Sequence, residues 1–279
     1  MYFHISLLLQ AAEPMTLTEA IKLNNIEWLE AQYADGLNFN LPTREGFMPI
    51  VLASSECQLE VIEMLVLIGE AEVDMPDSSG RTALIEASSR GCNSIVEFLL
   101  NNNCDLNKAD IDGVTALHAA SQAGHVETVE SLLNSGASPH VKDTDGSTPL
   151  TAVCSCVGDE LTNHVQVAKL LLQTGCDVNE VNNSLQTALH KASSAGNLEL
   201  CQLLLASPNI SVDPVDDIQC TPLLHAVSQG HVKVVNLLIA SGADIHHLDQ
   251  DGRSSLGLAC LAGDEEIVKC FLEKAKESI

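Results

Sequence analysis

The stretch that decides the fold is DGVTALHAASQAGHVETVESLLNSGASPHVKDT, residues 112–144. Its opening Asp112-Gly113 predicts a tight turn, because glycine takes positive φ angles at little cost. Thr115 can cap the helix that follows by accepting a hydrogen bond from a first-turn N–H. Gly124 is expected to end that helix, since glycine readily adopts the left-handed conformation found there. The first half of the stretch therefore predicts a turn and a short helix.

The second half predicts a longer amphipathic helix. Val126, Val129, Leu132 and Leu133 follow the three- and four-residue spacing that places apolar side chains on one helix face. Gly136 then ends this helix, and a polar segment leads to the next Asp-Gly pair. The whole unit is a turn, a short helix, a second turn, a longer helix and a hairpin.

This unit recurs along the chain, and the repetition decides the fold class. The helix-opening positions are separated by 34, 33, 33, 39, 34 and 33 residues. They are Met48, Thr82, Thr115, Thr148, Thr187, Thr221 and Ser254. Proline follows three of them, at Pro49, Pro149 and Pro222. At this first helical position the missing N–H of proline costs nothing.

The recurring TALHAA-type segments resemble the start of the ankyrin repeat, a family with a period of about 33 residues. The resemblance covers residues 14–279 and implies an all-α solenoid of helix-turn-helix units joined by short β-hairpin loops. We expect about eight repeats in a single domain. Caps are expected at about 14–43 and 251–279, because a terminal repeat must cover one apolar face. Residues 1–13 are left as an N-terminal lead segment.

Three departures from the repeat pattern are visible. Leu185 stands where a turn glycine is expected, and Cys57 replaces a helix-ending glycine. The step from Thr148 to Thr187 is about six residues too long, and the excess lies near 158–163. Insertions of this kind usually map to loops. This one is either a tolerated surface loop or a specificity element for a partner.

Composition excludes several function classes. A net charge of −25, only 13 Lys and Arg, and 3% aromatic residues argue against nucleic acids and anionic membranes as partners. The sequence contains no run of 18 apolar residues, so a membrane-spanning helix is not expected. The ten cysteines show no CxxC pair and no zinc-type spacing. They are expected to be free thiols in a reducing compartment, so we predict a cytoplasmic protein, with the nucleus also open.

No catalytic constellation emerges from the sequence. Nucleophile-elbow, phosphate-loop and zinc-protease motifs are absent. The histidines follow the repeat: His118 and His190 lie in helix starts, and His125, His164 and His231 open second helices. They are expected to be structural, hydrogen-bonded residues. We expect neither a metal nor a cofactor, and we expect no enzymatic activity from the chain itself.

The hairpins between repeats carry much of the negative charge. The segments 70–81, 104–114, 137–147, 176–186, 210–220 and 243–253 hold 17 Asp or Glu and 4 Lys or Arg, a net charge of −13. In ankyrin proteins these tips and the inner helices line a concave groove that binds protein partners. The resemblance thus implies an acidic groove, for which a basic partner is complementary.

The residues that the resemblance assigns to this groove come from the hairpins and from the inner helices. They are Asp74, Asp77, Glu86, Arg90, Asp110, Asp112, Gln122, Asp143, Asp145, Ser155, Asp213, Asp216, Asp217, His225, Gln229, Asp249 and Asp251. Aspartate before glycine also forms turns, so the tip acids are either turn formers or recognition groups. Asp213, Asp216 and Asp217 are not followed by a turn glycine, which makes them better candidates for recognition.

The function predicted is non-catalytic protein–protein interaction by a monomeric scaffold, adaptor or inhibitor. The partner is a protein or peptide with a basic face, and neither nucleic acid nor membrane is expected. The alternative is the substrate-recruiting ankyrin region of a larger enzyme or ubiquitin-ligase assembly. Two hairpin asparagines, Asn107 and Asn179, match positions that ankyrin proteins can have hydroxylated, or they simply bond the hairpin backbone.

Overall fold

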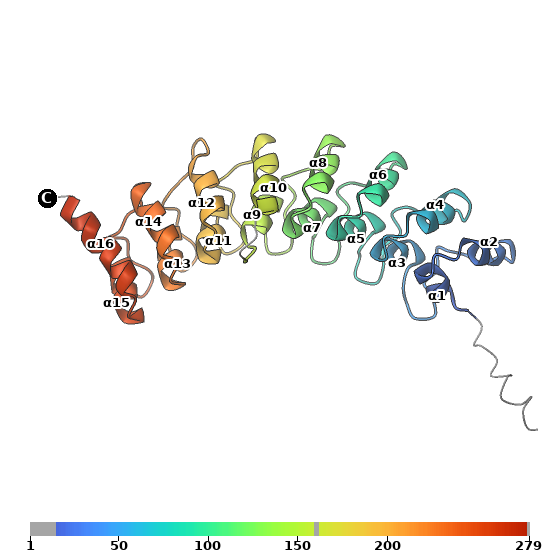
Figure 1. Cartoon of the computed structure of the whole chain (residues 1–279), viewed down its shortest axis with the longest axis horizontal. Coiled ribbons are helices and arrows are strands. Elements are labelled where there is room, and N and C mark those ends of the chain that lie inside the picture. Colours follow the sequence, from blue (N-terminus) through green and yellow to red (C-terminus); the bar gives the residue numbers. More distant parts are fainter. Residues whose placement is uncertain (1–14, 159–161, 278–279) are drawn as a thin grey trace, which may run out of the picture.

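The computed structural model describes residues 15–158 and 162–277, so the predicted lead segment 1–13 and residues 159–161 of the insertion lie outside the described residues. The described residues form a row of helix pairs that bends into an arc (Figure 1). β-Pairing in this part of the chain is limited to an isolated bridge between Leu248 and Ser254. The predicted all-α repeat architecture is confirmed.

Two rows of helices run along the arc. The inner row contains α1 (Leu17–Lys22), α3 (Pro49–Ser55), α5 (Ala83–Arg90), α7 (Ala116–Ala123), α9 (Pro149–Cys154), α11 (Ala188–Ala195), α13 (Pro222–Ser228) and α15 (Ser255–Ala262). The outer row contains α2 (Ile26–Ala34), α4 (Leu59–Leu67), α6 (Asn93–Asn101), α8 (Val126–Asn134), α10 (Thr162–Gln173), α12 (Leu198–Leu205), α14 (Val232–Ala240) and α16 (Glu265–Glu277). Each helix contacts its neighbours in the same row, so the apolar core runs continuously along the solenoid.

The helix starts agree with the sequence pattern at all seven predicted positions. Each predicted residue is the N-cap of an inner helix. At the six positions occupied by Thr or Ser, the side-chain hydroxyl accepts a hydrogen bond from a backbone N–H of the first turn. Met48 caps α3 without a side-chain bond, and Pro49 follows it at the first helical position. Gly124 ends α7 at a φ of 73°, as predicted.

The last repeat differs from the inner ones. Leu117 of α7 is 1% exposed because the next repeat packs on it, whereas its counterpart Leu256 of α15 is 38% exposed. Cys260 is exposed where its counterpart Ser121 is fully buried. The role of residues 251–279 as a terminal cap stays a prediction.

The insertion of the fifth repeat is not purely a loop. The outer helix α8 begins at Val126, whereas α10 begins at Thr162, three residues before the matching Val165. Part of the extra length therefore continues α10 by almost one turn at its N-terminal end. This corrects the expectation that the insertion maps entirely to a loop.

One pair of cysteines also departs from expectation. Cys57 and Cys92 form a disulfide, so the prediction of free thiols is wrong for these two. The other eight cysteines are free. Among residues 15–158 and 162–277, no helix combines the length and apolar character needed to cross a membrane.

Candidate binding surface

The inner helices lie on the concave side of the arc, and the hairpins project from the same side (Figure 1). This is the surface to which the predicted contact residues were assigned. Their side chains fall into two groups. One group is buried or half-buried and bonded within the hairpins and inner helices, and the other is exposed.

In five of the six hairpins one aspartate builds the turn itself, and in the hairpin 176–186 Asn182 takes this role. The carboxylate of Asp110 accepts the N–H groups of Asp112 and Val114 at 3.0 and 2.9 Å. Four other predicted acids do the same at the same repeat position, with one or two N–H groups each. They are Asp77, Asp143, Asp216 and Asp249. The turn role of these acids limits what they can offer to a partner.

A second position links several of the hairpins to the next one. The carboxylate of Asp74 accepts the N–H of Asp105 at 3.0 Å, and that of Asp213 accepts the N–H of Asp244 at 3.1 Å. Burial raises the pKa of Asp213, although the hydrogen bond from the Asp244 N–H opposes this effect. Asp213 is half-buried, so its carboxylate is not free for recognition as predicted.

Asparagines occupy this linking position in other repeats. The side-chain oxygen of Asn107 accepts the N–H of Ser138 at 2.9 Å. Asn179 accepts the N–H of Ser211 at 2.8 Å and donates to the carbonyl of Asn209 at 2.8 Å. Both amides therefore hold adjacent hairpins together, which is the structural role considered for them.

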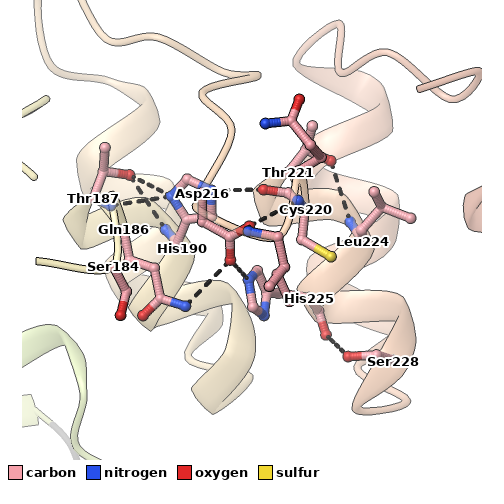
Figure 2. A network of polar contacts seen from close by, with 12 residues as sticks. Ser184, Gln186, Thr187, His190, Asp216, Cys220, Thr221, Leu224, His225 and Ser228 are labelled. Carbon is pink, nitrogen blue, oxygen red and sulfur yellow. Dashed lines mark hydrogen bonds and ion pairs between the residues drawn. The ribbon is translucent and has the colours of Figure 1, made fainter. Parts of the chain in front are cut away.

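The prediction for Asp216 is wrong, because this side chain is fully buried. Figure 2 shows its polar contacts. Its Oδ1 accepts the backbone N–H of Cys220 at 2.7 Å. Its Oδ2 accepts from Nε2 of His225 at 2.8 Å and from Nε2 of Gln186 at 3.3 Å. Burial favours a raised pKa, but the bonds from His225, Cys220 and Gln186 outweigh it and lower the pKa of Asp216.

His225 is held in place by this network. Its ring donates to Asp216 and packs edge-on against the ring of His190, with centroids 5.6 Å apart. The pair has the form of a base and its orienting carboxylate, yet the neighbouring nucleophiles are not activated. Ser228 donates to the backbone carbonyl of His225, and burial beside Asp216 raises the pKa of Cys220 to about 11. The arrangement positions a polar side chain and does not supply nucleophilic chemistry.

Two further predicted acids are buried and paired with arginine. Glu86 is 8% exposed and bonds Arg81 at 2.9 Å and Arg90 at 3.1 Å. Asp249 is 5% exposed and bonds Arg253 at 2.8 Å. Neither carboxylate can contact a partner directly, which corrects both assignments. The sequence reasoning missed Arg81, although its place four residues after the turn acid Asp77 matches that of Arg253 after Asp249.

The remaining predicted residues are exposed on the concave side. They are Arg90, Asp112, Gln122, Asp145, Ser155, Asp217, Gln229 and Asp251. Asp251 is paired with Arg253 at 2.6 Å. The side chains of Asp112, Asp145 and Asp217 make no recorded bond within the described residues. Their backbones, however, are fixed by bonds between successive tips, for example from Thr144 N–H to the Asp112 carbonyl at 2.8 Å.

A groove lies between the hairpin tips and the inner helices α5 and α7. Its volume is about 510 Å³, and its lining includes Arg81, Asp112 and Gln122. The small side chain of Ala119 also lines the groove, as does Ile111 of the hairpin tip, which is 69% exposed. Another groove of about 660 Å³ lies at the N-terminal end and contains none of the predicted residues. In the part of the chain that is described, no cluster of three His, Cys, Asp or Glu could hold a metal ion.

Comparison with known proteins identifies one family. A family model described as ankyrin repeats (3 copies) matches residues 17–110, 50–143, 117–216, 161–249 and 211–278. A transient receptor potential cation channel subfamily A member 1 homolog of Caenorhabditis elegans is 30% identical over 112 residues, which are 40% of this chain and 9% of the channel.

Two smaller relatives show a similar level of identity. The ankyrin repeat protein YahD of Escherichia coli is 32% identical over 123 residues, 42% of this chain and 59% of YahD. A Saccharomyces cerevisiae protein named probable 26S proteasome regulatory subunit p28 is 32% identical over 108 residues, 38% of this chain and 46% of p28. The matches span less than two thirds of each relative.

Proposed function

The chain belongs to the ankyrin-repeat family, whose repeats are protein–protein interaction modules. We propose that its concave surface binds a basic segment of a protein partner. Binding is non-catalytic. The preformed groove and the backbone bonds between hairpin tips reduce the ordering cost of association.

The observation that carries the proposal is the row of free carboxylates on the hairpin tips. Asp112, Asp145 and Asp217 are exposed, and no partner is recorded for their side chains within the described residues. The first of them lines the 510 Å³ groove, where the small side chain of Ala119 and the exposed Ile111 offer apolar contact. An extended segment with Lys or Arg beside an apolar residue would match this surface.

Charge complementarity of this kind acts mainly on the association rate and on specificity. Because the contact acids are exposed, their attraction for a basic segment is screened by salt. A partner bound mainly through apolar contacts would lose little affinity in high salt. The salt dependence of binding therefore separates the two modes.

A charge-neutralised variant tests the proposal. The probes are basic peptides selected on the wild-type protein from a random library. The variant Asp112→Asn/Asp145→Asn/Asp217→Asn should bind them at least tenfold more weakly, a loss of about 1.4 kcal/mol or more in binding free energy. Peptide binding is measured by fluorescence anisotropy at low and high salt. Folding should be retained, because surface substitutions without contacts change stability by about 0.5 kcal/mol or less.

The matched control carries the same change of charge on the outer helices. Glu97→Gln/Glu130→Gln/Glu199→Gln alters exposed acids of α6, α8 and α12. This variant should bind within about twofold of wild type, because long-range charge effects are screened. Equal losses in both triple variants would contradict a concave site, and selected peptides without Lys or Arg would contradict a basic partner.

A second candidate is the recruiting region of a larger enzyme or ligase assembly. The observation in its favour is that the matched segment is 9% of the channel relative, so such repeats occur within much larger proteins. Under this alternative the same surface binds a substrate while other chains supply the chemistry. Purification of the native complex with its activity attached would support it.

Hydroxylation of Asn107 and Asn179 stays a prediction. Both side-chain oxygens accept a backbone N–H of the next repeat, so a hydroxyl group would have to be added without breaking that bond. The intact mass of the protein from its native cell should show the addition of one or two oxygen atoms. A mass equal to that of the unmodified chain would rule the modification out.

A further inference from the structure

A recurring pair of residues packs at three interfaces between repeats. The glycine that ends an inner helix faces a histidine at the start of the outer helix of the following repeat. The pairs are Gly91 with His125, Gly124 with His164, and Gly196 with His231. A Cβ atom added to the glycine would lie 2.4–2.9 Å from the imidazole ring. The ring therefore occupies the space that a side chain at the glycine position would need.

The interface between α3 and α5 has a different pair at the same positions. Cys57 lies 34 residues before Gly91, at the glycine position, and Cys92 lies 33 residues before His125, at the histidine position. Cys57 keeps the positive φ of the glycines, at 54°. A histidine at position 92 would clash with the Cβ atom of Cys57, whereas the smaller thiol of Cys92 fits there. The two Cα atoms are 5.7 Å apart, inside the usual range for a disulfide, and the sulfurs are bonded.

We propose that Cys57 and Cys92 form a reversible redox site that covalently ties the second repeat to the third. This inference is independent of the proposed binding function. The reactant is a low-molecular-weight disulfide such as oxidised glutathione, which is reduced while the protein dithiol is oxidised.

The exchange proceeds in two balanced steps. The Cys57 thiolate, exposed at the surface, attacks the small disulfide, forms a mixed disulfide and releases one thiolate. The Cys92 thiolate then attacks the Cys57 sulfur and releases the second thiolate. Each cysteine gives its proton to solvent, and each released thiolate takes one up. Excess small thiol reverses both steps.

Three of the buried free cysteines are less suited to this chemistry. Burial raises the pKa of Cys104 and Cys201 to about 12, and it also raises the pKa of Cys154. A thiol of raised pKa supplies little thiolate at neutral pH, so exchange at these three cysteines is suppressed. Cys57 combines exposure with a second cysteine directly across the interface.

The bond lies at a position where it can change the behaviour of the solenoid. Repeats are stabilised mainly by their interfaces with neighbours. The second repeat meets the third without the histidine bond that His125 makes to the Ser89 carbonyl at 3.2 Å in the next interface. Reduction should therefore allow α1–α4 to open more often, and oxidation should couple them to the remaining repeats.

Peptide mapping of the full chain tests the site. The protein is incubated with oxidised glutathione, and the remaining thiols are then blocked with iodoacetamide. We expect a peptide pair linked through Cys57 and Cys92, which disappears after dithiothreitol. The oxidised protein should melt about 5 °C or more above the reduced protein. Hydrogen exchange in α1–α4 should be slower in the oxidised form.

A matched variant restores the pair found elsewhere in the chain. Cys57→Gly/Cys92→His should fold, show no difference in melting between oxidant and reductant, and lack the linked peptide. Recovery of both cysteines as alkylated thiols after oxidised glutathione would overturn the proposal. A melting shift of the same size in the double variant would overturn it as well, because the shift would then come from other cysteines.

Discussion

Replacing Asp216 with alanine is expected to lower the free energy of unfolding by about 3 kcal/mol. The carboxylate is fully buried and accepts bonds from the turn backbone, from Gln186 and from His225. Its removal leaves several buried donors without an acceptor, and burying an unpaired polar group costs more than the average hydrogen bond contributes. The measurement is urea denaturation followed by circular dichroism.

The neighbouring Asp217 provides the control. It is exposed, and its side chain has no recorded partner among the described residues, so Asp217→Ala should change stability by about 0.5 kcal/mol or less. Both variants remove the same negative charge from adjacent positions. Similar urea midpoints for the two variants would contradict the structural role assigned to Asp216.

Acidification is expected to destabilise the protein through its buried histidines. Burial lowers the pKa of His118, and it lowers the pKa of His190 to about 4 although the Cys220 carbonyl opposes the shift. The unfolded chain takes up these protons near pH 6.5, whereas folded His190 does so only near pH 4. Stability is therefore full above about pH 6.5 and falls as the pH drops toward 4, by about 3 kcal/mol for His190 alone.

The variant His190→Gln isolates this contribution. Its urea midpoint should fall less than that of wild type between about pH 7 and about pH 4.5, even though it starts from a lower value. His246 is exposed, so His246→Gln should keep the wild-type pH dependence. An unchanged pH dependence in His190→Gln would show that acid destabilisation comes from other groups.

The fold could be predicted because its signals are local. A threonine cap, a proline at the first helical position and a glycine after the helix each act within one turn. Different combinations of these signals mark the seven helix starts, and their spacing fixes the register. Side-chain partners across repeats were harder to foresee. Cys57 and Cys92 are 35 residues apart, and only the alignment of repeats reveals that they replace a glycine and a histidine.

The candidate surface was predicted only in part. No turn glycine follows Asp216, which favours a recognition role, yet Gln219 adopts a positive φ of 58° and the turn forms. The acid is then bonded within its hairpin like Asp110 and the others. Exposure separates Asp112, Asp145 and Asp217 from these turn acids, and exposure depends on packing that the repeat pattern alone does not give.

The central claim is that the partner lies on the concave face. A photo-activated benzoylphenylalanine placed at Gln122 lines the 510 Å³ groove, and one at Glu130 lies on the exposed face of the outer helix α8. Irradiation with a basic peptide selected on the wild-type protein, followed by mass spectrometry, measures which site forms the adduct. We expect an adduct at position 122 that is lost in high salt, and little at position 130. Equal adducts at both sites, or an adduct at position 130 alone, would contradict it.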